Sequence, residues 1–270
     1  MALSIAIPRP HPKYGTELVR DWNPEGEPVA AVVLVHGIAE HSGRYEAVGD
    51  RLSEAGFEVR GFDLVGHGVT GGTRGHVDDW AEFLDQIEAH VAEMRETGLP
   101  LVLFGHSMGG NLVLDYAIAG RPAPDIIVAS APALYGGAGW QRKLAPVLAR
   151  IAPKLAVPSK IKGEQLSRDP MVGERYFADP LVLTRATASL GAQLFAAMDR
   201  VAAGAGKIEV PVLVLHGEDD TIVPARSTEA LGDLEGFERR TYPGLRHEIL
   251  NEPEGPEILD EIIDWVRARL

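Results

Sequence analysis

The chain has 270 residues, of which 45% are hydrophobic and 24% are charged, and this composition is typical of a folded globular protein. A formal net charge of −13 argues against nucleic acid as a partner, because its phosphates would be repelled. The absence of cysteine excludes disulfides, thiolate metal ligands and a cysteine nucleophile, and it fits a reducing compartment.

The N-terminal residues lack the features of a targeting signal. Met1–Pro8 has neither the basic stretch nor the long apolar core of a signal peptide. The longest apolar run, Val29–Val35, is far shorter than the roughly 20 residues that span a membrane. We therefore expect a cytoplasmic protein.

Apolar runs alternate with helical patterns along most of the chain. The runs that predict strands are Ala30–Val35, Phe57–Phe62, Leu101–Phe104, Ile126–Ala129, Val210–Leu215 and Glu238–Tyr242. Lys13–Asp21 is typical of an added edge strand. The segments with a helical pattern are Gly43–Ala55, Asp78–Glu96, Gly109–Ala119, Ala225–Leu234 and Glu257–Leu270. This alternation predicts an α/β fold with a mostly parallel central sheet and helices on both faces.

The alternation is interrupted once, between the strands predicted at Ile126 and Val210. About eighty residues there contain no clear strand, and a structureless loop of that length is implausible in a compact domain. We therefore predict a helical cap over residues 133–204, inserted into a core formed by residues 1–132 and 205–270. Ligands of open α/β sheets bind beyond the carboxyl ends of the strands, where such a cap would lie.

The pentapeptide Gly105-His106-Ser107-Met108-Gly109 lies between a predicted buried strand and a predicted helix. A G-x-S-x-G sequence in this context is typical of a nucleophile elbow, a tight turn that presents a serine hydroxyl. The glycines give room for the strained turn and for close packing of the helix. Ser107 is therefore the predicted nucleophile, and a plain strand-to-helix turn is the alternative.

A nucleophilic serine requires a base that is oriented by an acid, and in folds with this elbow the acid and then the base follow the serine. His247 lies in a glycine-containing loop after the last predicted strand and is the predicted base, whereas His216 ends a strand before any suitable acid. The carboxylates available as the acid are Glu218, Asp219 and Asp220. The motif register favours Asp220, with Asp219 as the alternative. The cluster lacks the ligand spacing of a calcium loop, so no metal site is predicted.

Two backbone N–H groups must stabilise the oxyanion of a tetrahedral intermediate. We expect one from Met108, the residue after the nucleophile, and the other from Ile38, in the loop after the strand Ala30–Val35. Gly66–Gly71 matches the G-x-G-x-x-G pattern of dinucleotide sites. Further glycines follow it in place of a helix, so no nucleotide cofactor is expected.

With these residues the chain resembles the monoacylglycerol lipase family of the α/β-hydrolase superfamily, especially bacterial members, over nearly its whole length. The segments that carry the resemblance are His36–Tyr45, Gly66–Gly68, Gly105–Gly110, Ser130–Pro132, Ser167–Pro170 and His247–Pro253. The resemblance implies an α/β-hydrolase fold and hydrolysis of a monoacylglycerol to a fatty acid and glycerol through an acyl-enzyme, without cofactor or metal. It also implies a triad of Ser107, Asp220 and His247. A broader carboxylesterase, a lysophospholipase or an aminopeptidase on the same scaffold is the alternative.

The resemblance also includes Glu40 and Arg44, spaced i,i+4 on the helix expected after Ile38. An ion pair that steadies the oxyanion loop is favoured for these two residues over a glycerol site.

Basic residues gather in the predicted cap. The segment from Ile126 to Gly163 contains no Asp or Glu, and its positive charges are Arg142, Lys143, Arg150, Lys154, Lys160 and Lys162. Trp140–Ile151 combines apolar and basic residues. Packing of its apolar side on the core is the simpler interpretation, and peripheral contact with a membrane or lipid surface is the alternative.

Overall fold

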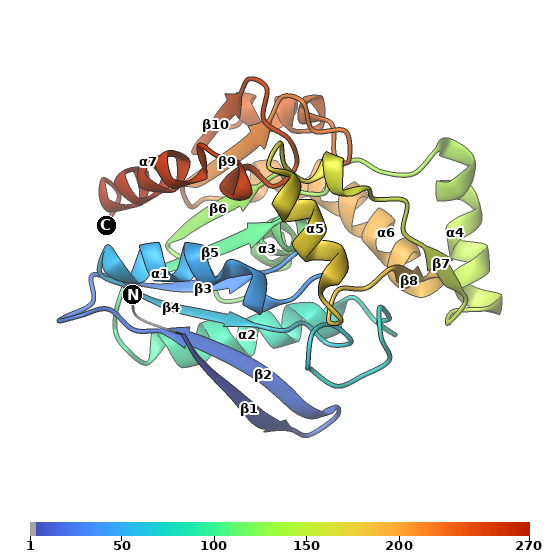
Figure 1. Ribbon diagram of the computed structural model, residues 1–270, viewed down its shortest axis with the longest axis horizontal. Helices are drawn as coiled ribbons and strands as arrows, with labels where there is room; N and C mark the ends of the chain where they lie inside the picture. The colour runs from blue at the N-terminus through green and yellow to red at the C-terminus, as the bar shows by residue number, and fades with distance from the viewer. Residues whose placement is uncertain (1–3) are drawn as a thin grey trace.

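The protein, represented here by a computed structural model that describes residues 4–270, is built on one large β-sheet (Figure 1). The strands of this sheet are β1 (Ile5–His11), β2 (Gly15–Trp22), β3 (Ala30–Val35), β4 (Phe57–Phe62), β5 (Leu101–His106), β6 (Ile126–Ser130), β9 (Val212–Gly217) and β10 (Phe237–Tyr242). Their order is β1-β2-β4-β3-β5-β6-β9-β10. The β1–β2 and β2–β4 pairs are antiparallel and the other pairs are parallel, which confirms the predicted mostly parallel sheet.

Helices cover both faces of this sheet, as predicted. One face carries α1 (Glu46–Glu54) and α7 (Gly255–Arg267), and the other carries α2 (Ala81–Arg95) and α3 (Met108–Ile118). Within residues 4–270, no helix combines the length and the apolar composition required to cross a bilayer.

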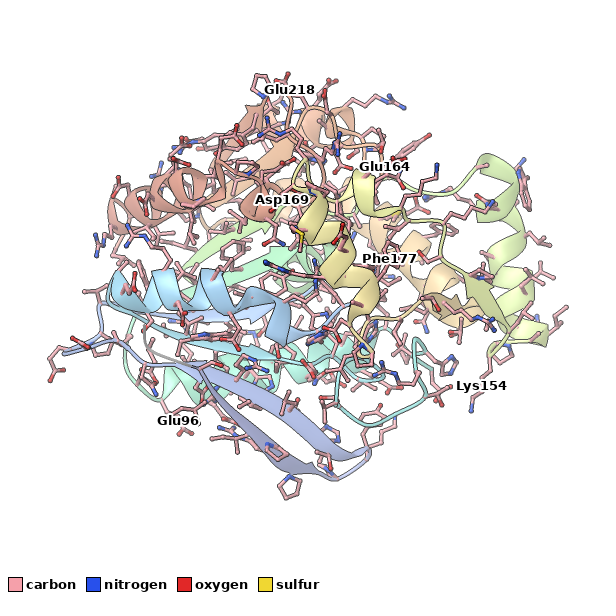
Figure 2. The ribbon with its side chains drawn as sticks, in the orientation of Figure 1. Glu96, Lys154, Glu164, Asp169, Phe177 and Glu218 are labelled. Atoms are coloured by element: carbon pink, nitrogen blue, oxygen red, sulfur yellow. The ribbon has the colours of Figure 1, made fainter. Side chains whose placement is uncertain are left out.

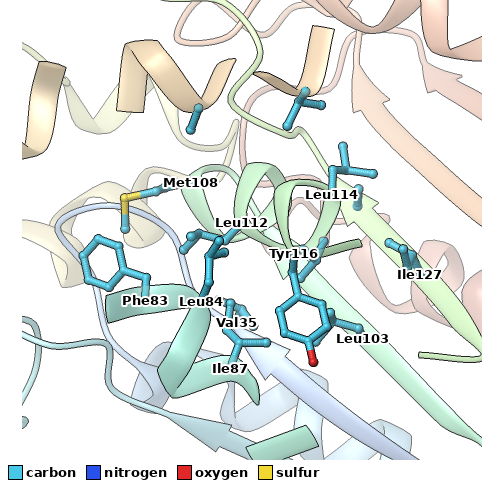
Figure 3. Close-up of a cluster of buried hydrophobic side chains, with 14 of the residues drawn as sticks. Val35, Phe83, Leu84, Ile87, Leu103, Met108, Leu112, Leu114, Tyr116 and Ile127 are labelled. Atoms are coloured by element: carbon cyan, nitrogen blue, oxygen red, sulfur yellow. The ribbon is translucent and has the colours of Figure 1, made fainter. Parts of the chain in front are cut away.

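Alternate side chains of the central strands enter two different cores. Val33 and Val35 of β3 pack in the cluster with α2 and α3, whereas Val32 and Leu34 pack in the cluster with α1 and α7. Figure 3 shows the first cluster, where Met108 and Leu112 of α3 lie close to Phe83 of α2. This packing fixes the first turn of α3 above the end of the sheet.

The N-terminal prediction was incomplete. The strand expected at Lys13–Asp21 is β2, but it pairs with β4 on one side and with β1 on the other, so β1 is the edge. Pro8 and Pro10 within β1 obscured this strand in the sequence, because proline is tolerated in a sheet only at an edge or a bulge. Residues 1–3, at the start of the stretch considered as a signal peptide, lie outside the described residues.

Residues 133–204, called here the inserted segment, contribute no strand to the large sheet. The elements of the inserted segment are α4 (Gly139–Ile151), β7 (Ala156–Pro158), the 3₁₀ turn η2 (Gly163–Gln165), α5 (Pro170–Ala178), β8 (Arg185–Thr187) and α6 (Ala188–Gly204). The expectation that this segment contains no strand is wrong, because β7 and β8 form a short antiparallel pair. Figure 1 shows α4, β7, β8 and α6 together at the right-hand end of the molecule, with α6 against α3.

The helix expected at Ala225–Leu234 is instead a 3₁₀ helix, η4 (Ala225–Asp233). The hydroxyl of Thr228 lies 2.9 Å from the carbonyl oxygen of Ala225, and such bonding of a side chain to the backbone competes with α-helical bonding. The remaining 3₁₀ helices are η1 (Ser42–Tyr45), η3 (Ala205–Lys207) and η5 (Ile249–Asn251).

Candidate active site

Ser107 occupies the sharp turn between β5 and α3, with φ 53° and ψ −115°. A positive φ is unusual for a residue with a side chain and is characteristic of strained functional turns. The two flanking glycines are required by close packing. A Cβ atom on Gly105 would overlap the carbonyl of Gly109, and one on Gly109 would overlap the carbonyl of Val35. The G-x-S-x-G sequence therefore permits a turn that other residues would prevent.

The structure brings His247 and Asp220 to this serine. His247 Nε2 lies 3.0 Å from Ser107 Oγ, and His247 Nδ1 lies 2.6 Å from Asp220 Oδ2. Asp219, the alternative acid, is exposed, whereas Asp220 is buried. The three side chains follow the carboxyl ends of β5, β9 and β10 in chain order, which explains why they meet at one edge of the sheet.

The surroundings of Asp220 and His247 shift the pKa values of both side chains. Burial alone would raise the pKa of Asp220, but the charge of His247 and hydrogen bonds from His216 and His247 hold it well below its usual range. Burial alone would lower the pKa of His247, but the charge of Asp220 and the hydrogen bond to it raise this pKa above its ordinary value. The pair is therefore an ionised carboxylate beside a strengthened base.

The loop after β3 passes directly beside the serine. A Cβ atom built on Gly37 would lie 3.2 Å from Ser107 Cβ, so the backbone next to Ile38 is in contact with the turn. The N–H of Gly37 donates to Glu40 Oε1 at 2.6 Å. Met108 begins α3, and the N–H groups of a first helical turn have no partner within the helix. Both predicted oxyanion residues thus lie at the serine.

An apolar cavity of about 370 Å³ reaches this loop from the inserted segment. Residues that line it include Ile38, Leu144, Leu148, Ala188, Gly191 and Phe195. Its walls come mainly from α4, β8 and α6, and Ile38 and Ala39 of the loop after β3 complete the lining, so the inserted segment encloses an apolar space that reaches this loop.

Comparisons with known proteins identify the family of this chain. Residues 26–254 match the family described as serine aminopeptidase, S33. The chain is 36% identical to the monoacylglycerol lipase of Mycolicibacterium smegmatis in an alignment that covers 95% of each protein. The chain belongs to the monoacylglycerol lipase family of the α/β-hydrolase superfamily. This hydrolase is also 32% identical to the monoglyceride lipase of Homo sapiens, over 93% of this chain and 86% of the human protein.

Its fold matches the crystal structure of the monoacylglycerol lipase of Paleococcus ferrophilus with a TM-score of 0.86. The two chains are 35% identical, and the match covers 93% of this hydrolase and 98% of the other protein. The similarity therefore extends through the inserted segment as well as the sheet.

The loop of His247 is held by the inserted segment of the hydrolase. The N–H of Glu248 donates to the carbonyl of Leu166 at 2.8 Å, and Ser167 Oγ donates to the carbonyl of Asn251 at 2.9 Å. Arg168 forms an ion pair with Glu252. Two of the segments that carried the family resemblance, Ser167–Pro170 and His247–Pro253, are thus in contact.

A buried charge network joins the loop of Ile38 to the loop of His247. Arg44 forms an ion pair with Glu40 and donates two hydrogen bonds of 2.8 Å to the carboxylate of Glu248. Its guanidinium also lies 4.7 Å from the ring centre of Tyr176 in α5. Glu40 precedes η1, so the expectation that Glu40 and Arg44 share a helix is wrong, although the predicted ion pair between them is present.

Glu40 also accepts from Tyr45 Oη at 2.7 Å, which adds to its bond from Gly37. The cavity beside this network holds only about 20 Å³, about the room that one water needs. These contacts favour a role in steadying the loop over a glycerol site. Sequence reasoning missed Glu248, and its position next to the predicted base was the available signal.

We predict that Glu40→Gln destabilises the protein in a pH-dependent way. Burial alone would raise the pKa of Glu40, but Arg44 and nearby histidines lower it from 4.5 to about 2. Because the folded-state pKa is lowered, the carboxylate stabilises the fold above pH 4.5, and this contribution is lost as the pH falls toward 2. The difference in unfolding free energy between wild type and variant should therefore shrink across that range.

Urea denaturation at about pH 7 and about pH 3 measures this difference. Glu96→Gln, at an exposed position, is the control, and its unfolding free energy should differ from that of the wild type by the same amount at both pH values. The prediction would be contradicted if the difference in unfolding free energy between wild type and Glu40→Gln were the same at both pH values.

Proposed function

We propose that the protein hydrolyses monoacylglycerols to a fatty acid and glycerol. The observation that carries this proposal is His247, which bridges Ser107 Oγ and Asp220 at hydrogen-bond distances. An apolar cavity reaches Ile38, in the loop that contacts Ser107 through Gly37. A single acyl chain is the part of the substrate that fits an apolar cavity, and the ester at its end would lie at Ser107. The relatives named monoacylglycerol or monoglyceride lipase support this choice of substrate.

The proposed reaction proceeds in two steps. His247 Nε2 takes the proton of Ser107 Oγ as that oxygen attacks the ester carbonyl, and glycerol leaves with the proton from His247. Water then attacks the acyl-enzyme with the same histidine as base, and the fatty acid is released. Asp220 holds the proton of His247 on Nδ1 and stabilises the charged imidazole.

The N–H groups of Ile38 and Met108 are the proposed donors to the oxyanion. Loss of one such donor costs about 3 kcal/mol of transition-state stabilisation in other serine hydrolases. The ion pair of Glu40 and Arg44 supports this role indirectly, because Glu40 holds the N–H of Gly37 and so fixes the loop before Ile38.

We predict that Ser107→Ala lowers kcat on a long-chain monoacylglycerol by about 10⁴- to 10⁶-fold, because the acyl-enzyme no longer forms. The same variant should lose labelling by a fluorophosphonate probe. Ser227→Ala, which lies far from the elbow in the chain, should keep both properties. Hydrolysis by a folded Ser107→Ala at the wild-type rate would refute the proposed function.

A matched pair of substitutions tests which carboxylate is the acid. Asp220→Asn should lower kcat by about 10⁴-fold, because the amide favours the wrong tautomer of His247. Asp219→Asn should leave kcat close to the wild-type value, since that side chain is exposed. Steady-state kinetics on the same ester measure both, and the reverse order would identify Asp219 as the acid.

The apolar cavity predicts a preference for long acyl chains. A substitution that fills the cavity should abolish this preference. A Cβ atom on Gly191 would meet open space, so Gly191→Phe should fill part of the cavity. Hydrolysis of long-chain monoacylglycerols should fall at least about tenfold, while that of butyrate esters should persist. Gly191→Ala is the control. Equal losses on both ester classes would argue against acyl binding in this cavity.

We further propose that residues 133–204 form a cap that contacts lipid surfaces through α4. Trp140 is 66% exposed and Ile151 is 73% exposed, so the apolar side of α4 packs only partly on the protein. Trp140 and Leu148 also line the cavity, whereas Ile151 does not. Arg142 forms an ion pair with Asp199 of α6, so its charge is already paired within the protein.

Exposed cations surround this apolar side. Among the described residues, no carboxylate forms an ion pair with Lys143, Arg150, Lys154 or Lys160. Figure 2 shows Lys154 projecting at the right-hand edge of the molecule, below α4. Apolar side chains flanked by cations are the arrangement that suits an anionic lipid surface.

We predict that Lys143→Gln/Arg150→Gln weakens binding to phosphatidylserine-containing vesicles by about 2 kcal/mol, at about 1 kcal/mol for each basic residue near the surface. Co-sedimentation with vesicles measures this change. Lys13→Gln/Lys207→Gln removes the same charge elsewhere and should bind as wild type does. Equal binding by both double variants would exclude a role for α4.

A further inference from the structure

His216 is a buried histidine that the proposed mechanism does not use, although it lies beside the proposed acid. It lies in β9 and is fully buried. Its Nε2 atom is 2.7 Å from the carbonyl oxygen of Val223 and 3.2 Å from Asp220 Oδ2. Both neighbours are acceptors, so Nε2 carries a proton and donates to them.

The other ring nitrogen of His216 has a partner that fits this proton arrangement. Nδ1 is the acceptor of a neutral ring with a proton on Nε2, and Thr228 Oγ1 lies 3.3 Å from it. Arg239 donates from Nε to Thr228 Oγ1 at 3.0 Å and from its terminal nitrogen to the carbonyl of Ala225 at 2.9 Å. Thr228 Oγ1 also lies 2.9 Å from the carbonyl of Ala225, so its one proton has two acceptors in reach, and Arg239 already donates to one of them.

Both oxygens of the Asp220 carboxylate accept hydrogen bonds. Oδ1 accepts from the N–H groups of Ile222 and Val223 at 2.8 and 2.9 Å. Oδ2 is shared by His247 at 2.6 Å and His216 at 3.2 Å. A carboxylate offers about four acceptor directions, and these four donors fill them.

We infer that His216 is a positioning residue, which holds Asp220 and the Val223 carbonyl so that Oδ2 faces His247. This inference rests on the proposed function, because it assumes that Asp220 orients the base. Arg239 and Thr228 form the outer end of one chain of hydrogen bonds that runs through His216 and Asp220 to the base. This series of hydrogen bonds predicts that catalysis depends on His216, although its ring does not contact the substrate.

The matched substitutions are His216→Gln and His216→Asn. The amide nitrogen of Gln reaches the place of Nε2 and keeps the donor to Asp220, whereas that of Asn reaches only the place of Nδ1. His216→Asn should lower kcat on a p-nitrophenyl ester by about 10- to 100-fold with an unchanged KM, as for a displaced catalytic group. His216→Gln should retain most of the wild-type kcat.

The pH profile separates positioning from a general loss of stability. Asp220 without a donor from His216 is more basic, so it should raise the pKa of His247 and move the acidic limb of kcat/KM to higher pH. The other titratable groups that face His247 are Glu40, His106 and Glu248. They are unchanged in these variants, so a shift of the limb reports on the Asp220 contact.

Thr228→Val keeps His216 but removes the hydroxyl beside its Nδ1 atom, and it should lower kcat in the same direction by less. This variant decides the case if the His216 variants do not fold. Wild-type kcat and an unchanged acidic limb in folded His216→Asn, or equal losses in the Asn and Gln variants, would overturn the inference. A failure of the proposed function itself is distinguishable, because the wild type would then neither label at Ser107 nor hydrolyse the ester.

Discussion

The close approach of the first turn of α3 to the ends of β3 and β5 is the constraint on which the site depends. Gly105 and Gly109 permit it, and the core around Met108 and Leu112 holds the helix in place. The strained backbone of Ser107 persists because this packing leaves the turn no alternative. The same contact places the loop of Ile38 beside the serine, so one packing arrangement positions both the proposed nucleophile and the proposed oxyanion donors.

Buried charge is the second constraint on the site. Arg44 connects Glu40, near Ile38, with Glu248, next to His247, and its guanidinium lies on the ring of Tyr176 in the inserted segment. Three segments distant in the sequence are thus joined through one guanidinium, whose planar set of donors suits two carboxylates at once. A change at Arg44 would affect the loop of Ile38, the loop of His247 and α5 together.

Much of the fold and the candidate site could be predicted because both depend on local patterns. Apolar runs such as Val32–Val35 identify buried strands, and the G-x-S-x-G sequence with the chain order of acid and base selects Ser107, Asp220 and His247, which the structure places within hydrogen-bond distance. The contacts of Glu248 and His216 could not be predicted, because they depend on how distant loops meet. Strand β1 and the 3₁₀ geometry of η4 were missed since proline and a threonine hydroxyl overrode the simple patterns.

The hairpin of β1 and β2 has a consequence for the behaviour of the protein in concentrated solution. An exposed strand at the border of a sheet is a template on which a second molecule can add its own strand. Proline carries no N–H group, so Pro8 and Pro10 deprive the outermost strand of two donors that such an addition would use. The N-terminal hairpin therefore closes the sheet against growth by self-association along that border.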